Sequence, residues 1–78
     1  MEEKLLRLLA QVCGDDIVLY DRQVDLWEEE LLDSLGLMQL LDGIEDLFNL
    51  EIYPTQVSPE MFATPQRVLE LVKEKTEG

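Results

Sequence analysis

The stretch that decides the fold is "DSLGLMQLLDGIEDLFN", residues 33–49. It opens on Asp33, a residue type favoured at the N-cap of a helix. Apolar residues then follow at helical spacing, which indicates one buried face. They are Leu37, Leu40, Leu41, Ile44, Leu47 and Phe48. The stretch therefore predicts a helix that begins at Asp33 and ends near Asn49, a residue type tolerated at helix C-termini.

Two further helices are predicted on either side of this one. Residues 2–13 place Leu5, Leu8, Leu9 and Val12 at helical spacing, and Gly14 ends the pattern. Thr64 and Pro65 begin a final helix, in which Val68, Leu69 and Val72 share a face. A short helix is expected at "SPEMF", residues 58–62, with Ser58 as its N-cap.

The remaining segments are predicted without regular helices. Residues 14–33 indicate a long loop that scattered apolar side chains hold to the core, and a connection of that length is often functional. Residues 50–57 are expected to be extended, and "KTEG" at the end of the chain to be frayed. The fold class is therefore all-α, with three main helices, one short helix and a long first loop. Because a 78-residue chain supports only one small core, residues 1–78 are expected to form a single domain.

Charge and hydropathy exclude several classes of partner. The chain has 18 acidic and 6 basic residues, a net charge of −12, which repels nucleic acids and anionic bilayers and favours electropositive proteins. No window approaches the roughly 20 apolar residues of a membrane-spanning helix, and the acidic N-terminus is unlike a secretory signal. We therefore expect a cytoplasmic monomer with no membrane insertion. The single cysteine, Cys13, is expected to act as a small buried hydrophobic residue.

The residue types also argue against an enzyme. The chain contains no histidine, so Ser-His-Asp and Cys-His sites and the common zinc motifs are excluded. Its acidic runs are expected to be solvated, because paired catalytic carboxylates need a cleft that separates their pKa values. "DDIVLYDRQVD" lacks the central glycine and the terminal glutamate of a calcium-binding loop. No catalytic or metal-binding residue is assigned.

The composition does not assign a role to Ser34. It would lie in the first turn of the predicted helix, where unpaired backbone N–H groups and the helix dipole favour an anion such as a phosphate. Alternatively, Ser34 only assists the helix cap. At about 100° per residue, Leu35 and Met38 point away from the core, beside Asp42 and Glu45. This is the chemistry of a docking face, although scattered exposed apolar residues are also normal. Ser58, which precedes Pro59, is interpreted as structural.

The motif "DLWEEELLDSLGLMQLL" resembles the phosphopantetheine attachment site of acyl and peptidyl carrier proteins. Within that superfamily the chain is similar to the D-alanyl carrier proteins of teichoic acid D-alanylation. The similarity covers nearly the whole chain, through "LAQVCGDDIV", "EELLDSLG", "QLLDGIEDLFNLEI" and "ATPQRVLELV". Members often have glycine where this chain has Glu30. The resemblance implies the fold of an acyl-carrier-protein-like bundle.

The resemblance also implies a carrier that is not itself catalytic. A phosphopantetheinyl transferase would attach 4′-phosphopantetheine to Ser34, with Asp33 near the metal that the transferase uses. A D-alanine-activating ligase would then charge the cofactor thiol, and a membrane-bound O-acyltransferase system would receive D-alanine. Partner recognition is expected at Asp33, Leu35, Met38, Asp42 and Glu45.

Two alternatives remain at this stage. The first is a stand-alone acyl or aminoacyl carrier of fatty-acid, polyketide or nonribosomal peptide synthesis. The second is a helical interaction module without a covalent cofactor, which would bind one protein permanently through Leu35 and Met38.

Overall fold

A computed structural model describes residues 2–77 of the chain. It contains the α-helices α1 (Glu2–Cys13), α2 (Ile17–Tyr20), α3 (Ser34–Phe48) and α4 (Pro65–Glu77), and the 3₁₀ helices η1 (Pro54–Gln56) and η2 (Pro59–Phe62). The described residues include no strand, so the prediction of an all-α fold is confirmed. The three main helices are those expected, and the short helix expected at "SPEMF" is η2.

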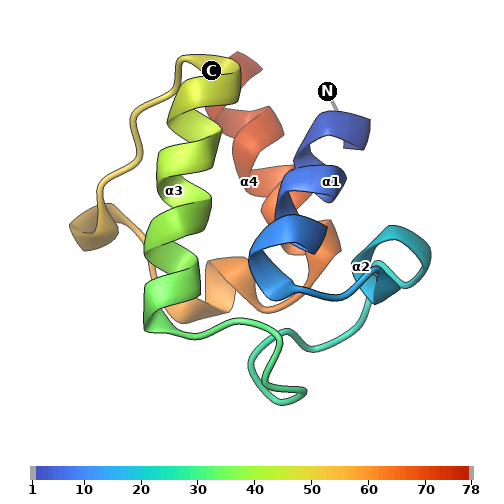
Figure 1. Cartoon of the computed structure of the whole chain (residues 1–78). Helices are drawn as coiled ribbons and strands as arrows, with labels where there is room; N and C mark the ends of the chain where they lie inside the picture. The colour runs from blue at the N-terminus through green and yellow to red at the C-terminus, as the bar shows by residue number, and fades with distance from the viewer. Residues whose placement is uncertain (1, 78) are drawn as a thin grey trace.

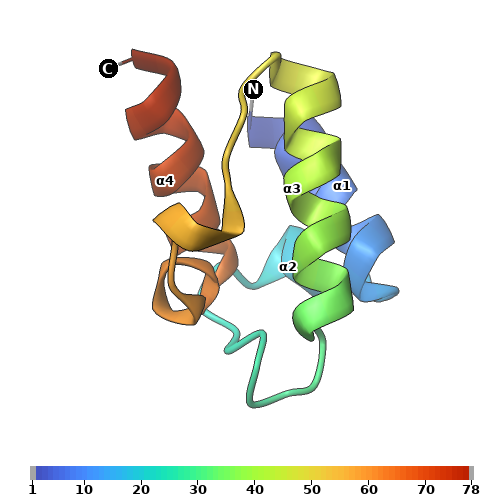
Figure 2. The same cartoon turned by 90° about the vertical axis from the view of Figure 1, so that its left-hand side faces the viewer.

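The main helices form a small bundle in which α1 packs against α2, α3 and α4. The start of α1 and the ends of α3 and α4 lie at one end of the molecule, while α3 begins at the opposite end (Figures 1 and 2). The long first connection crosses that opposite end before it enters α3. After α3 the chain runs back along this helix toward its beginning (Figure 2). The first turn of α3 therefore lies at an exposed end of the bundle.

Local signals in the sequence set the limits of α1 and α3. Gly14 has a φ of 70°, in the left-handed region that favours glycine, and its N–H donates to the Ala10 carbonyl at 2.8 Å. The Asp33 side chain accepts a hydrogen bond of 2.7 Å from the Gly36 N–H, as an N-cap should. Asn49 ends α3 with a φ of 53°. The predicted boundaries of both helices are confirmed.

The core is entirely apolar among the described residues and contains no buried charged or polar side chain. It is built from one face of each main helix together with single residues of the connecting segments. Its fully buried members include Leu5, Leu9, Val18, Leu26, Leu40, Ile44, Phe62, Val68 and Val72. Leu47, which was predicted to belong to the core, is 47% exposed, because it lies at the edge of the apolar face of α3. There it lines a surface cavity together with Leu8 and Gly43.

The first connection is more ordered than predicted. The expectation of a loop without structure over residues 14–33 was wrong at Ile17–Tyr20, which form α2 after an Asp15 side chain accepts the Ile17 N–H at 2.9 Å. The expectation that apolar side chains hold this segment to the core is confirmed, since Val18, Leu26 and Leu32 are buried.

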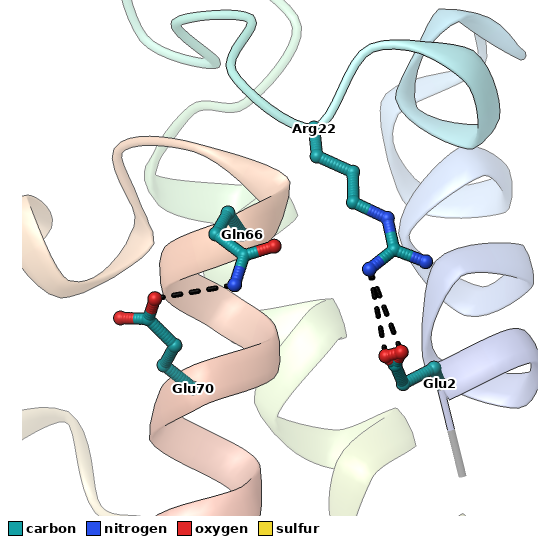
Figure 3. A network of polar contacts seen from close by, with 4 residues as sticks. All are labelled: Glu2, Arg22, Gln66 and Glu70. Atoms are coloured by element: carbon teal, nitrogen blue, oxygen red, sulfur yellow. Dashed lines mark hydrogen bonds and ion pairs between the residues drawn. The ribbon is translucent and has the colours of Figure 1, made fainter.

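Polar contacts also tie this connection to the helices around it. The Arg22 guanidinium contacts the Glu2 carboxylate on α1 at 3.4 Å (Figure 3). Figure 3 also shows a bond of 3.2 Å within α4, from the Gln66 side chain to Glu70. The Arg22 carbonyl accepts the Gln66 N–H at 3.0 Å, so the connection touches the start of α4 as well. Closer to α3, the indole N–H of Trp27 donates to the Pro59 carbonyl at 3.1 Å. These bonds fix the path of the chain into α3.

Two other predictions are corrected. Residues 50–57 are not extended throughout, because residues 54–56 form η1, where the Gln56 N–H donates to the Tyr53 carbonyl at 2.9 Å. The C-terminal "KTEG" is not frayed as far as the structure describes it, since α4 continues to Glu77; Gly78 lies outside the described residues.

Candidate functional site

Ser34 is the first residue of α3, and its side chain is exposed. The first backbone bond that closes a turn of α3 runs from the Leu37 N–H to the Asp33 carbonyl, at 2.8 Å. The N–H groups of Ser34 and Leu35 precede that bond and face the helix end, where the dipole favours negative charge. Within residues 2–77 the Ser34 hydroxyl has no hydrogen-bond partner. It is therefore not the residue that caps the helix.

The cap is supplied by Asp33. Its side-chain oxygen accepts the Gly36 N–H, and its backbone is extended, which leaves Ser34 to point outward. Gly36 is buried, and a Cβ added there would lie 3.2 Å from both Asp33 Oδ1 and Leu32 Cδ1. The side chains around Gly36 therefore leave little room for a larger residue beneath Ser34. The tight packing holds the first turn of α3 in place.

The segment that leads to Ser34 is a compact turn. The Leu26 carbonyl accepts the N–H groups of both Leu31 and Leu32 at 2.9 Å, and the Leu26 N–H donates to the Ala63 carbonyl at 2.8 Å. Glu30 has a φ of 57°, a left-handed conformation that is unfavourable for residues with a Cβ. The glycine that is often found at this position in the carrier proteins that the chain resembles would adopt this conformation without strain.

Four of the five sequence-predicted recognition residues lie together on the exposed face of α3, and the fifth, Asp33, caps the helix just before Ser34. Leu35 is 68% exposed and Met38 is 47% exposed, and both follow Ser34 within the first turns. Asp42 and Glu45 are also exposed on the following turns. The structure thus brings apolar side chains and carboxylates onto one surface beside Ser34.

The sequence did not predict that residues after α3 also border this surface. Tyr53 is 53% exposed, and with Glu51 and Ile52 it lines a cavity of about 200 Å³ against Met38, Leu41, Asp42 and Glu45. The Tyr53 hydroxyl donates to Glu51 at 2.8 Å, and this bond, followed by the charges on Glu51 and Glu45, raises the pKa of Tyr53. The sequence signal for this contact was the acidic and aromatic "EIY", residues 51–53, shortly after α3. Because this segment was expected to be extended, nothing in the sequence indicated that it folds back onto α3.

The other candidate nucleophiles are less suited to modification. Ser58 is half-buried and directly precedes η2, although its side chain makes no capping hydrogen bond. Cys13 is half-buried, and burial followed by the charge on Asp15 raises its pKa to about 11.

No group of three or more potential ligands for a metal ion occurs within residues 2–77. None of the helices described in that range has both the length and the hydropathy of a membrane-spanning segment.

Comparisons with known proteins identify the family. The family model described as "Phosphopantetheine attachment site" matches residues 3–74. A D-alanyl carrier protein of Abiotrophia defectiva is 41% identical over 75 residues, which cover 96% of this chain and 95% of that protein. The D-alanyl carrier proteins of Bacillus licheniformis and Bacillus subtilis are 35% and 34% identical, with 92% and 94% of both chains covered.

The prosthetic group of this family is 4′-phosphopantetheine, a covalent cofactor joined to protein through a phosphodiester. The exposed hydroxyl at the start of α3 fits such a group, since the surrounding surface is open and the helix end favours an anion. The match to the family model and the identity over nearly the full length of the relatives lead to one conclusion. The chain belongs to the phosphopantetheine-attachment family of carrier proteins, together with the D-alanyl carrier proteins.

Proposed function

We propose that this chain, as a single carrier domain of residues 1–78, carries D-alanine as a thioester on 4′-phosphopantetheine attached to Ser34. The observation that supports the proposal most directly is the exposed Ser34 hydroxyl at the first turn of α3, in a chain whose relatives are named D-alanyl carrier proteins. When bound, the cofactor supplies the thiol that holds the amino acid. The chain itself presents and positions that group and has no catalytic role.

Each residue at the site has a distinct part in this proposal. The Ser34 oxygen would bear the phosphodiester, next to the backbone N–H groups of the first turn. Asp33 keeps that turn closed through the bond of one carboxylate oxygen to the Gly36 N–H, and because the residue is exposed, its other oxygen would be available to a metal ion held by a transferase. Leu35 and Met38 offer apolar contact to each visiting enzyme.

We propose three successive partners. A phosphopantetheinyl transferase modifies Ser34, a D-alanine-activating ligase of which this chain is the carrier subunit charges the thiol, and a membrane-bound O-acyltransferase system takes the amino acid for lipoteichoic or wall teichoic acid. Asp42 and Glu45 would attract basic residues on these partners, because opposite charges accelerate encounter. In this scheme the chain works in the cytoplasm as a monomer.

The test begins with the intact mass of the protein after incubation with coenzyme A and a phosphopantetheinyl transferase. The wild type should gain the mass of one phosphopantetheine, Ser34→Ala should gain none, and Ser58→Ala should behave as the wild type. Equal modification of Ser34→Ala would reject the site, and no modification of the wild type would leave the interaction module as the better hypothesis.

Charging tests the identity of the cargo. The modified protein is offered a panel of amino acids with the cognate ligase, and separately malonyl-transferring enzymes. D-Alanine should be loaded in preference to every other group. Preferential loading of another amino acid or of a malonyl group would reject D-alanine and support a carrier of peptide, polyketide or fatty-acid synthesis.

A further inference from the structure

A groove lies beside α3 and begins about one turn after Ser34, at Met38. Its cavity of about 200 Å³ is lined by Met38, Leu41, Asp42, Glu45, Glu51, Ile52 and Tyr53. The floor is apolar, since Leu41 and Ile52 belong to the buried core. The rim is acidic, with Asp42 and Glu45 on α3 and Glu51 on the segment after it. Figure 2 shows that this segment runs back along α3.

The groove is on the same side of α3 as Ser34. At about 100° per residue, Ser34, Met38, Leu41 and Glu45 fall within a sector of about 60°. Asp42 follows Ser34 by eight residues, which is about 12 Å along the helix axis. A flexible group attached to the Ser34 oxygen with the length of phosphopantetheine can therefore reach the groove without leaving this face.

The charge of the groove is uncompensated. Asp42, Glu45 and Glu51 all line it, and no lysine or arginine does. Within the described residues, none of these three carboxylates forms an ion pair; Glu51 only accepts the Tyr53 hydroxyl. The hydrogen bond to Glu51 is the main cause of the raised pKa of Tyr53, and the charges on Glu51 and Glu45 add to it. A small cation would complement this surface.

We propose that the groove receives the aminoacyl end of the prosthetic arm, with the cargo's ammonium group among the carboxylates of Asp42, Glu45 and Glu51 and its methyl group over Leu41 and Ile52. This inference rests on the proposed function, which supplies the arm and its aminoacyl cargo. A short, positively charged cargo fits the acidic rim. A long apolar acyl chain does not, because it would have to cross the charged rim to reach a core whose side chains are already packed.

The test compares two cargoes that differ only in the ammonium group. A phosphopantetheinyl transferase can transfer the whole arm from D-alanyl-coenzyme A or from propionyl-coenzyme A, which loads the protein without the ligase. Amide NMR spectra of the two forms are then recorded. Glu51, Tyr53 and the α3 residues that line the groove should shift in the alanyl form relative to the propionyl form. Identical shifts at these residues would overturn the inference.

A second readout follows the cargo itself. The α-amino group of an amino acid linked through its carboxyl group titrates at or below the roughly 7.7–8.0 of a peptide N-terminus. In the groove the pKa of ¹³C-labelled D-alanine on the protein should exceed that of free D-alanyl-pantetheine by about 0.5 unit or more, because nearby carboxylates favour the charged form. Equal pKa values for the bound and free thioesters would overturn the inference.

Charge-matched variants assign the effect to the groove. Asp42→Asn combined with Glu45→Gln should lower the pKa of the cargo toward the free value. Asp16→Asn combined with Glu74→Gln removes the same charge from exposed positions on other elements and should leave the pKa unchanged. An equal decrease in both double variants would mean that only the net charge acts, and it would reject the groove.

Failure of this inference can be distinguished from failure of the proposed function. If the mass shows an intact alanyl arm on Ser34 but the groove residues and the cargo pKa are unaffected, only the inference is wrong. If the ligase does not load D-alanine while the chemically loaded protein shows the shifts, the groove stands as a site for a small cationic cargo and the assignment of D-alanine is wrong.

Discussion

At the scale of single residues, Glu30 shows a conflict between its side chain and its backbone. Its φ of 57° places Cβ close to the following carbonyl, a conformation that favours glycine. Glu30→Gly should raise the free energy of unfolding by about 0.5–1 kcal/mol, after the extra freedom of glycine in the unfolded chain is subtracted. Urea denaturation should show a higher midpoint with an unchanged slope.

Loss of a negative charge beside Glu28 and Glu29 could also stabilise this segment. Glu30→Gln separates the two causes, because it removes the charge but keeps the Cβ. The glutamine variant should gain clearly less than the glycine variant. Equal gains would show that charge repulsion, and not the backbone conformation, is the source of the effect.

Cys13 is a second residue with a specific expected behaviour. Its pKa of about 11, against an ordinary value of 9.0, arises mainly from burial at the end of α1. At pH 8 the native thiol should react with iodoacetamide at least about 10-fold more slowly than the thiol of the urea-unfolded chain, because only the thiolate is nucleophilic. A native rate equal to the unfolded rate would contradict the structural role of Cys13.

The same pKa difference has a consequence for stability. The folded protein holds the Cys13 proton more tightly than the unfolded chain does, so the stabilising contribution is complete below pH 9 and is lost as the pH rises toward about 11. Over that range Cys13→Ala should lose less stability than the wild type, as measured by the urea midpoint at each pH. Parallel pH profiles would show that Cys13 does not titrate in this way.

The sequence predicted single residues well where the local chain determines their role. Asp33 caps α3, and Ser34, Leu35 and Met38 are exposed, because these properties depend on one helix. Tyr53 and Glu51 were missed, because their place beside α3 depends on how the following segment folds back. The left-handed conformation of Glu30 was also not predictable, since the residue type disfavours it.

At the scale of elements, the contact between α1 and α3 depends on Gly43. A Cβ at this position would lie 2.6 Å from Leu8 Cδ1 and 3.2 Å from Leu8 Cγ. Alanine has a helix propensity better than that of glycine by about 1 kcal/mol, but overpacking costs about 1–3 kcal/mol. Because the whole Leu8 side chain would have to move, Gly43→Ala should lower the free energy of unfolding by about 1 kcal/mol.

A double-mutant cycle isolates the steric cause. Leu8→Ala should destabilise on its own, since it removes a partly buried side chain. In that background Gly43→Ala should become neutral or stabilising, by up to about 1 kcal/mol, because the obstacle is gone and the helix propensity remains. Additive effects in urea denaturation would rule out a clash between these two residues.

Except for η2, which Ser58 and Pro59 marked as a helix start, the lengths of the elements explain which of them the sequence predicted. α1, α3 and α4 have 12, 15 and 13 residues, long enough for a repeated apolar pattern with recognisable ends. α2 and η1 have 4 and 3 residues, which is about one turn and too short for any periodicity. Such turns form because tertiary contacts, such as the burial of Val18, hold the chain in place.

At the scale of the whole molecule, charge is distributed unevenly along the chain. Residues 23–66, which include the lead-in to Ser34 and all of α3, contain ten acidic residues and no lysine or arginine. All six basic residues lie outside this range, on α1, on α4 and directly after α2. Residues 23–66, which include Ser34, therefore carry a net charge of −10, which should steer basic partners toward them.

This steering predicts a salt dependence for the modification of Ser34. Reversing Asp42 and Glu45 to lysine should slow the transferase by about 3–10-fold at about 20 mM salt and by much less at about 300 mM, where ions screen the charges. Initial rates from intact mass give the measurement. The matched reversal of Asp16 and Glu74 makes the same change in net charge at exposed positions outside residues 23–66 and should have a smaller effect. If the Asp42 and Glu45 reversal slows modification equally at both salt concentrations, the two carboxylates act through direct contact with the transferase, since contact in a desolvated interface is screened far less than long-range attraction.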